Sequence, residues 1–239
     1  MTEIFSRTQA LLGKDVMEKL SHSRVALFGL GGVGGAALEA LVRSGVDHID
    51  VFDFDTVSPS NINRQIIATA KNIGEKKTEA ARLRANAISP ETKITVHDMF
   101  YLPENADSID FKDFDVVIDA VDTVTAKLEI ISRAKGLNIP VISCMGTGNK
   151  TDLTKLKAGD LFSTSGCPLA RVMRKELKAR GIFSLRVVWS DEKPFFAEDT
   201  KDLKGNRPAP SSAIFVPVAA GLLLAKEAID LIAKGESNG

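Results

Sequence analysis

A glycine-rich turn between a short apolar run and an amphipathic segment most restricts how this chain can fold. The apolar run 24–28 has the length of a buried strand, and the helix expected next covers 33–44, ending before Gly45. Glycines between them would let a backbone approach a phosphate at the amino end of that helix. They are Gly29, Gly31, Gly32 and Gly34. The segment therefore predicts a nucleotide-binding turn, and the alternative is tight helix packing without a ligand.

Strands and helices alternate through the rest of the first half. Further strands are expected at 49–53, 93–97, 116–120 and 139–144, and helices at 75–87 and 123–137. Ala80, Leu83 and Ala87 should form one face of helix 75–87. Short apolar strands separated by helices predict a doubly wound, Rossmann-like α/β fold, with a mainly parallel sheet covered on both faces.

The pattern loosens in the second half. We expect a loop with a short strand over 147–161, a helix over 168–180, a strand over 184–190 and a polar loop over 191–212. The apolar run 213–225 is shorter than the roughly 20 residues of a membrane-spanning helix. We therefore expect no membrane insertion. We expect instead a strand followed by a buried helix that begins near Pro217 and covers about 218–234. We therefore divide one continuous domain into a nucleotide-binding half, 1–146, and a C-terminal extension, 147–239.

Charge is balanced overall but unevenly distributed. Basic and acidic residues both number 31, which excludes a protein that is basic along its whole length and coats nucleic acid. Residues 150–186 nevertheless carry nine basic and three acidic side chains. This stretch is where a polyanionic partner would be expected to bind.

The number of cysteines predicts whether zinc is bound, and the N-terminal residues predict where the protein is located. Cys144 and Cys167 are too few for a disulfide framework or a four-thiolate zinc site, so we expect no bound zinc. The first 15 residues lack the apolar core of a secretory signal. The expected location is cytoplasmic.

Charged side chains beside the glycine turn favour ATP over a nicotinamide cofactor. Asp53 lies 24 residues after Gly29 at the end of the second strand, where a carboxylate can bind ribose hydroxyls. Arg64, Lys77 and Asp122 have no role in hydride transfer, whereas a triphosphate uses cations and a carboxylate that holds Mg²⁺. The alternatives are solvated surface cations and, for Asp122, a helix N-cap.

Four motifs resemble the nucleotide-binding half of the HesA/MoeB/ThiF superfamily, whose members are related to ubiquitin-activating enzymes. They are GLGGVG at 29–34, DFDTVSPSNINRQ at 53–65, GEKK at 74–77 and DAVD at 119–122. Members of the superfamily are homodimers that use ATP and Mg²⁺ to adenylate a carboxylate. The resemblance therefore implies the adenylation fold of ubiquitin-activating enzymes, with a C-terminal extension.

The resemblance also implies roles for individual residues. Arg64, Lys77 and Asp122 would be catalytic, together with Arg7, which would reach into the partner subunit's site. Asp122 would also hold Mg²⁺ through ATP. The implied ATP-binding residues are Gly29, Gly31, Gly32, Gly34, Asp53, Asp55, Ser60, Asn61, Arg64, Lys77, Asp122 and Thr123.

The second half resembles the tRNA threonylcarbamoyladenosine dehydratases. The matching segments are PLARVMRKELKARGI at 168–182, VVWSDEKP at 187–194 and FVP at 215–217. Cys167 stands where that family often has Asp. The resemblance implies a ligase-type, adenylate-forming enzyme that dehydrates threonylcarbamoyladenosine, next to the tRNA anticodon, to its cyclic form.

Two alternatives to this function stay open. An enzyme that adenylates the C-terminus of a ubiquitin-like sulfur carrier would usually carry two Cys-x-x-Cys zinc pairs, which this chain lacks. A nucleotide sensor would bind ATP without turnover. The sequence identifies neither the tRNA substrates nor a monovalent ion or a sulfur-relay protein among the partners.

The expected helix 168–180 has one apolar and one cationic face. Leu169, Met173 and Leu177 have the spacing of a core-facing stripe. The cations lie on the other side and could bind tRNA phosphates. They are Arg171, Arg174, Lys175, Lys178 and Arg180. The alternative is a solvated basic helix without a ligand.

Overall fold

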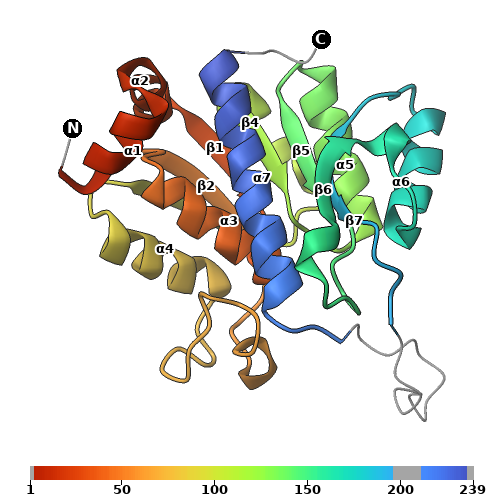
Figure 1. The fold of residues 1–239 in the computed structure, drawn as a ribbon, viewed down its shortest axis with the longest axis horizontal. Coiled ribbons are helices and arrows are strands. Elements are labelled where there is room, and N and C mark those ends of the chain that lie inside the picture. Colours follow the sequence, from red (N-terminus) through yellow and green to blue (C-terminus); the bar gives the residue numbers. More distant parts are fainter. Residues whose placement is uncertain (1–2, 196–210, 236–239) are drawn as a thin grey trace.

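The computed structural model describes residues 3–195 and 211–235. A seven-stranded sheet forms its centre, in the order β3-β2-β1-β4-β5-β7-β6, with every neighbouring pair parallel except β6 and β7 (Figure 1). The strands are β1 Arg24–Phe28, β2 His48–Asp53, β3 Lys93–Asp98, β4 Val116–Asp119, β5 Val141–Cys144, β6 Leu156–Asp160 and β7 Arg186–Ser190. The predicted mainly parallel α/β fold is confirmed.

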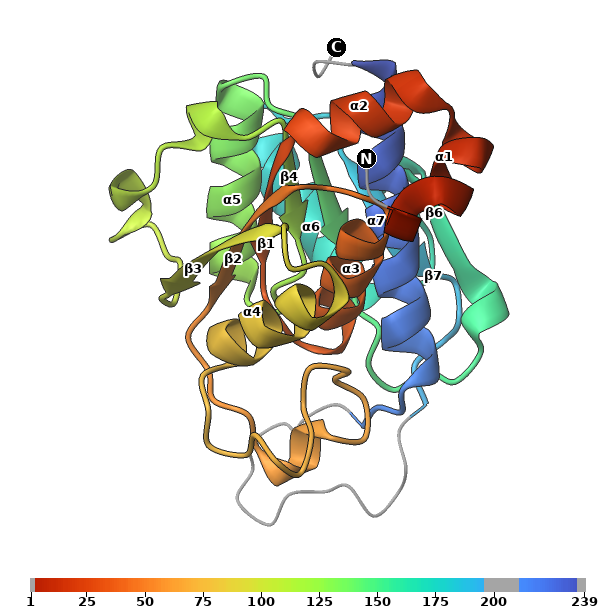
Figure 2. The same ribbon diagram turned by 90° about the vertical axis from the view of Figure 1, so that its left-hand side faces the viewer.

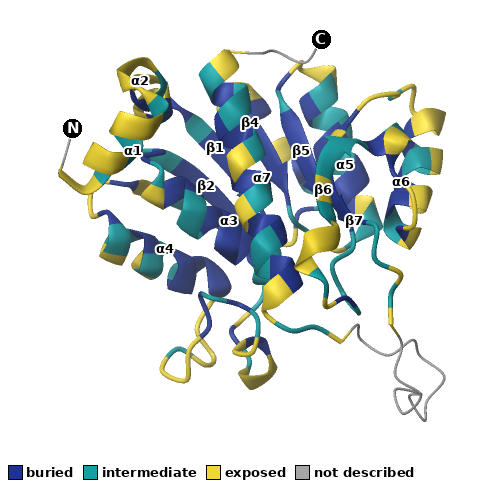
Figure 3. Ribbon diagram, viewed as in Figure 1, coloured by how far each residue is buried: buried dark blue, intermediate teal, exposed yellow. Residues whose placement is uncertain are grey.

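Helices cover both faces of the sheet and enclose two apolar cores. They are α1 Ser6–Leu12, α2 Lys14–His22, α3 Gly32–Arg43, α4 Lys77–Ile88, α5 Val124–Gly136, α6 Pro168–Ala179 and α7 Phe215–Lys234. One core packs α2, α3, α4 and α7 against the sheet, and the other packs α5 and α6 against the opposite face. The inner strands β1, β2, β4, β5 and β7 are almost wholly buried between them, whereas the edge strands β3 and β6 are more exposed (Figure 3). This burial explains why each central strand is a near-continuous apolar run.

Helix α7 joins the end of the chain to its first half. It lies beside α3 in both views of the ribbon (Figures 1 and 2), and Gly221 makes the contact close. A Cβ atom at Gly221 would lie 2.2 Å from the backbone oxygen of Val33, so only glycine fits there. The helix start that shapes the glycine turn is therefore held in place by a residue from the C-terminal extension.

Two predictions about elements are wrong. The described residues 211–214 form no strand before the last helix, because α7 already begins at Phe215 and takes Pro217 into its first turn, where the missing N–H is not needed. Leu83 is 51% exposed and Ala87 is also exposed, so they do not form the buried face of α4. Ala81 and Ala85 are buried instead, since their small side chains allow α4 to approach the sheet closely.

Two segments need separate mention, the N-terminal helices, which were not predicted, and the predicted loop 191–212, which is only partly described. Residues 6–22, for which no element was predicted, form α1 and α2 after a short turn at residues 3–5. The polar loop expected at 191–212 lies partly outside the described residues. Among the described residues, no helix combines the length and the apolar character needed to cross a membrane.

Candidate nucleotide-binding site

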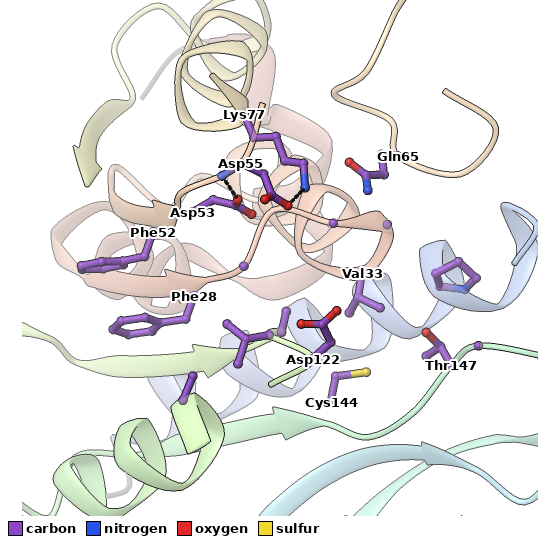
Figure 4. Close-up of a pocket in the computed structure, with 18 of the residues that line it drawn as sticks. Phe28, Val33, Phe52, Asp53, Asp55, Gln65, Lys77, Asp122, Cys144 and Thr147 are labelled. Carbon is purple, nitrogen blue, oxygen red and sulfur yellow. Dashed lines mark hydrogen bonds and ion pairs between the residues drawn. The ribbon is translucent and has the colours of Figure 1, made fainter. Parts of the chain in front are cut away.

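A cavity of about 500 Å³ opens where β1, β2, β4 and β5 end (Figure 4). The carboxyl edge of a parallel sheet is where α/β proteins bind ligands. Most of the implied ATP-binding residues line this cavity. They are Gly29, Gly31, Gly32, Asp53, Asp55, Asn61, Arg64, Lys77 and Asp122. The structure therefore brings together motifs that are up to 93 residues apart in the sequence.

The glycine turn is shaped by two close backbone contacts. Gly29 has a φ of +89°, and a Cβ there would lie 2.8 Å from the backbone oxygen of Ala120. A Cβ at Gly34 would lie 1.7 Å from the backbone oxygen of Gly29. Gly34 is not among the residues that line the cavity, so its contribution is to bring α3 against the turn. The amino end of α3 thus points its free N–H groups at the cavity.

Asp53 fixes the turn from the end of β2. Its Oδ2 accepts a hydrogen bond from the Leu30 N–H at 2.6 Å, and its Oδ1 accepts one from the Asp55 N–H at 2.9 Å. Burial raises the pKa of Asp53, while the Lys77 ammonium and these two amides act in the opposite direction. A carboxylate has about four acceptor positions, so two stay available for ribose hydroxyls.

Lys77 is held in an ion pair at the amino end of α4. Its side chain is only 6% exposed, and its Nζ lies 2.6 Å from Oδ2 of Asp55, whose own side chain is 46% exposed. Lys77 is therefore not a solvated surface cation. The ammonium retains further N–H donors that can reach a phosphoryl oxygen in the cavity.

Arg64 is positioned by its own loop. Its Nη1 donates to the Ser60 backbone oxygen at 2.7 Å and to Oδ1 of Asn63 at 3.0 Å. Asn61 is buried, and its Oδ1 accepts a bond from the Ser58 N–H at 3.1 Å. Ser60 is exposed and is not among the cavity-lining residues. The loop thus presents Arg64 to the cavity, and we find no acidic partner for it among the described residues.

The Asp122 carboxylate has no cationic partner among the described residues. The residue at the N-cap of α5 is Thr123, no side-chain cap bond forms there, and the Thr123 hydroxyl donates to Oδ1 of Asp122 at 3.4 Å. Asp122 lines the cavity, and Thr123 is not among its lining residues. Within residues 3–195 and 211–235, no group of three acidic, His or Cys side chains could hold a metal. One carboxylate completed by phosphate oxygens nevertheless suits Mg²⁺.

Arg7 and the cations of α6 lie outside the cavity. Arg7 is exposed on α1, which both ribbon views place away from the loops at the cavity (Figures 1 and 2). Arg171, Lys175 and Lys178 are exposed on α6, with no ion pair to any described residue. Met173 and Leu177 are buried as predicted.

The predicted cationic face of α6 is smaller than expected. Arg174 is half-buried and donates to the backbone oxygen of Thr164 at 3.0 Å, so it fastens the preceding loop. Arg180 forms an ion pair with Glu176 at 3.0 Å. Placing Arg174 with exposed cations was therefore wrong, because spacing along a helix does not show that a neighbouring loop folds over the side chain.

Sequence reasoning missed a buried ion pair beneath the site. Lys127 is fully buried, and its Nζ lies 2.9 Å from Oδ2 of Asp119 and 2.9 Å from the backbone oxygen of Val121. Ser143 donates to the same Asp119 oxygen at 2.5 Å. A carboxylate at the end of an apolar strand was the available signal, since a buried charge requires a partner. The pair holds the turn that carries Asp122.

Both cysteines are buried near the cavity. Cys144 lines it, and burial raises the pKa of its thiol to about 12. Cys167 is the N-cap residue of α6 and is also buried, so it does not lie on a surface loop. A thiol that stays protonated at neutral pH is a poor nucleophile.

Comparison with known proteins identifies relatives along nearly the whole chain. The model of the ThiF family matches residues 5–238. The tRNA threonylcarbamoyladenosine dehydratase of Bacillus subtilis is 38% identical over 234 residues, covering 94% of this chain and 92% of that protein. The E. coli enzyme TcdA, solved in complex with ATP, superimposes with a TM-score of 0.89 at 30% identity, covering 99% of this chain and 97% of that one. The same enzyme in complex with AMP gives a TM-score of 0.89 at 29% identity, covering 98% and 95%.

Proposed function

The chain belongs to the ThiF family, and we propose that it is an ATP-dependent tRNA threonylcarbamoyladenosine dehydratase. It would cyclise threonylcarbamoyladenosine next to the anticodon by adenylating the threonyl carboxylate. The observation that carries this proposal is the single cavity that gathers the glycine turn, Asp53, Arg64, Lys77 and Asp122. The relatives that match over nearly the whole chain carry the name of this activity.

The reaction follows from the weakness of a carboxylate as an electrophile. A carboxylate oxygen attacks the α-phosphorus of ATP, pyrophosphate leaves, and a mixed anhydride with AMP forms. The carbamoyl group of the same nucleoside then attacks the acyl carbon, loses a proton and expels AMP, which carries away the carboxylate oxygen. The nucleoside has then lost the elements of one water. Because ring closure is intramolecular, positioning supplies most of the help it needs.

The residues of the cavity would position ATP and balance its charge. Lys77 and Arg64 supply cations, and the amino end of α3 supplies N–H groups for phosphoryl oxygens. Asp122 would hold Mg²⁺, which neutralises phosphate charge when it is bound. No protein nucleophile is required, which agrees with the raised pKa of Cys144.

A homodimer would bring Arg7 to the cavity of the partner subunit. Arg7 does not line the cavity of its own chain and belongs to α1, which both ribbon views place away from the loops at the cavity (Figures 1 and 2). Ile4 and Leu11 beside it are 56% and 83% exposed, which is typical of an interface. Mixing Arg7→Ala protein with Asp122→Ala protein should restore activity, because mixed dimers then contain one intact site. No recovery in confirmed mixed dimers would contradict this role.

Exposed cations on α6 would bind the tRNA backbone. Arg171, Lys175 and Lys178 have no acidic partner among the described residues, so their charge is available to phosphates. Arg174 and Arg180 contribute less, since each already has a protein partner.

One experiment tests the function as a whole. Purified protein is incubated with ATP, Mg²⁺ and tRNA from cells that lack dehydratase activity, and nucleosides and nucleotides are then analysed by mass spectrometry. We expect the cyclic nucleoside, with AMP and pyrophosphate in equal amounts. The control is tRNA without the threonylcarbamoyl group, which should release no AMP. Adenylation of the C-terminal carboxylate of a carrier protein, with release of pyrophosphate and no cyclic nucleoside, would favour the sulfur-carrier alternative.

A further inference from the structure

One end of the cavity is not occupied by the residues implied in ATP binding. It lies on the side away from Phe28 and Phe52, between Gln65 and Thr147 (Figure 4). The walls come from the loop after β5, the first turn of α6 and the start of α7. Figure 4 labels Gln65 and Thr147 at this end, and the other cavity-lining residues of these segments are Met145, Gly146, Gly148, Leu169, Ser212 and Pro217, of which Pro217 also borders Gly32.

Gln65 requires a hydrogen-bond partner that the described residues do not provide. Its side chain is only 5% exposed, and its Oε1 is buried without a partner among the described residues. Figure 4 shows the amide directed into the cavity. An unpaired buried polar group is unfavourable, and few remain in native proteins. A ligand that hydrogen-bonds to the Gln65 amide would remove this defect.

The chemistry of this end differs from that of the phosphate end. Thr147 directs its hydroxyl into the cavity, and the lining residues from the loop after β5, from α6 and from the start of α7 carry no charge. Leu169 and Pro217 add apolar surface. A ligand that suits such walls is neutral, has several donors and acceptors, and carries a small apolar group. A urea group together with a threonine side chain, which carries a hydroxyl and a methyl group, has these properties, whereas a phosphate does not.

The same end connects to the cationic face of α6. Leu169 lies in the first turn of that helix, two residues before Arg171 and nine before Lys178. A helix rises about 1.5 Å per residue, so the exposed cations extend over roughly 14 Å from the cavity. A tRNA whose backbone lies along α6 can therefore place a modified nucleoside in this end.

We propose that this end of the cavity binds the threonylcarbamoyl group, with the Gln65 amide hydrogen-bonded to its urea and the Thr147 hydroxyl to its threonyl part. The proposal rests on the proposed dehydratase function. The reacting carboxylate would then point toward Asp122 and the phosphates of ATP. Gln65 and Thr147 would act as substrate-binding residues that distinguish the modified tRNA from the unmodified one.

The test uses variants that lose one hydrogen-bonding group and keep the shape of the side chain. Gln65→Leu and Thr147→Val are compared with wild type and with Thr125→Val, an exposed threonine outside this cavity. We expect kcat/KM for threonylcarbamoyl-tRNA to fall about tenfold or more in each test variant, the effect of one unmade hydrogen bond. The dissociation constant for ATP alone, measured by titration calorimetry, should not change. Thr125→Val should behave like wild type in both measurements.

The outcomes separate this proposal from the function on which it rests. A wild-type protein that makes no cyclic nucleoside would contradict the function itself. An active wild type with unchanged kcat/KM in Thr147→Val, or in folded Gln65→Leu, would overturn the subsite. An equal loss of ATP affinity and of kcat/KM would also overturn it, because the residues would then serve the nucleotide. If Gln65→Leu does not fold, Thr147→Val decides.

Discussion

The cavity and the outer face of α6 both carry cations, but two lysines near the cavity are buried and paired, whereas three cations on α6 are exposed and unpaired among the described residues. Around the cavity, Lys77 and Lys127 are buried and each is paired with a carboxylate at 2.6 or 2.9 Å. On α6, Arg171, Lys175 and Lys178 are exposed and have no ion pair with any described residue. A buried charge acts strongly on a neighbour that is fixed in place, while an exposed charge is screened by water and salt.

This difference indicates two separate tasks. Fixed charges suit a reaction in which phosphoryl groups must be aligned to within a fraction of an ångström. Exposed, unpaired cations suit a large polyanion that binds through several weak contacts. Substitutions at the two places should therefore differ in size, in dependence on salt and in which measurement they change.

The largest effect is expected at the buried pair below the site. Lys127→Met leaves Asp119 charged and unpaired in the core, which should lower the free energy of unfolding by about 3–5 kcal/mol. The matched control is Lys226→Met on α7, which breaks an exposed pair with Asp230 and should cost about 0.5 kcal/mol or less. Urea denaturation measures both. Equal losses of unfolding free energy in the two variants would show that burial does not determine how much an ion pair contributes to stability.

The double variant Lys127→Met with Asp119→Asn sharpens this prediction. It removes the uncompensated charge, so part of the lost stability should return. No recovery would mean that Lys127 stabilises the fold mainly through its bond to the Val121 backbone oxygen.

The next effect concerns turnover. Asp122→Ala and Arg64→Ala should each lower the rate of ATP turnover by about 10²–10³, because one positioned charge at the reacting phosphates is lost. Stability should hardly change, since Asp122 is exposed and has no cationic partner among the described residues. Pyrophosphate release and thermal unfolding are measured together, with the exposed Glu104→Ala as control. Near-normal turnover in either variant would rule out the role assigned to that residue.

A smaller effect is expected on α6. Arg171→Glu with Lys175→Glu should weaken tRNA binding by about tenfold, since a few contacts of about 1 kcal/mol each exceed the 1.4 kcal/mol that tenfold requires. The dependence of binding on salt should also become flatter. ATP affinity should be spared, because neither residue lines the cavity.

Anisotropy with labelled tRNA at two salt concentrations measures the α6 effect. The control is Lys14→Glu with Lys112→Glu, two exposed cations elsewhere on the chain, which changes the net charge equally. If both pairs weaken binding to the same degree, net charge rather than the α6 face attracts tRNA.

The two regions also differ in how far the sequence predicts them. The mainly parallel sheet and most cavity residues follow from local signals, because each motif stands at the end of an apolar strand and parallel strands end at one edge. The pairing of Lys127 with Asp119 and the anchoring of Arg174 by Thr164 do not follow. Both contacts depend on the conformation of a turn or a loop, and the periodicity of apolar residues in the sequence does not predict that conformation. The same limit applies to Gln65, whose position in a motif does not reveal that its Oε1 has no partner among the described residues.

The smallest effect is expected at the cysteines, which lie between the two regions. Cys144 lines the cavity and Cys167 begins α6, so a thioester mechanism would have to use one of them. Burial raises the pKa of Cys144 to about 12, which keeps its thiol protonated at neutral pH, and intramolecular ring closure needs no thiolate. The Cys144→Ser, Cys167→Ser double variant should therefore retain cyclisation of the nucleoside, although two hydroxyls in apolar surroundings should lower stability by about 1–3 kcal/mol.

The matching Cys144→Ala, Cys167→Ala variant separates chemistry from packing, since it introduces no hydroxyl. Activity that is lost in both double variants, while both stay folded, would identify a thiol that takes part in the reaction. Activity that is kept in the alanine variant alone would trace the loss to the buried hydroxyls. Elemental analysis of the wild type should find no stoichiometric zinc, because two thiols are too few ligands for a structural zinc site. One zinc per chain would contradict that expectation and would reopen the comparison with zinc-bearing enzymes of sulfur carriers.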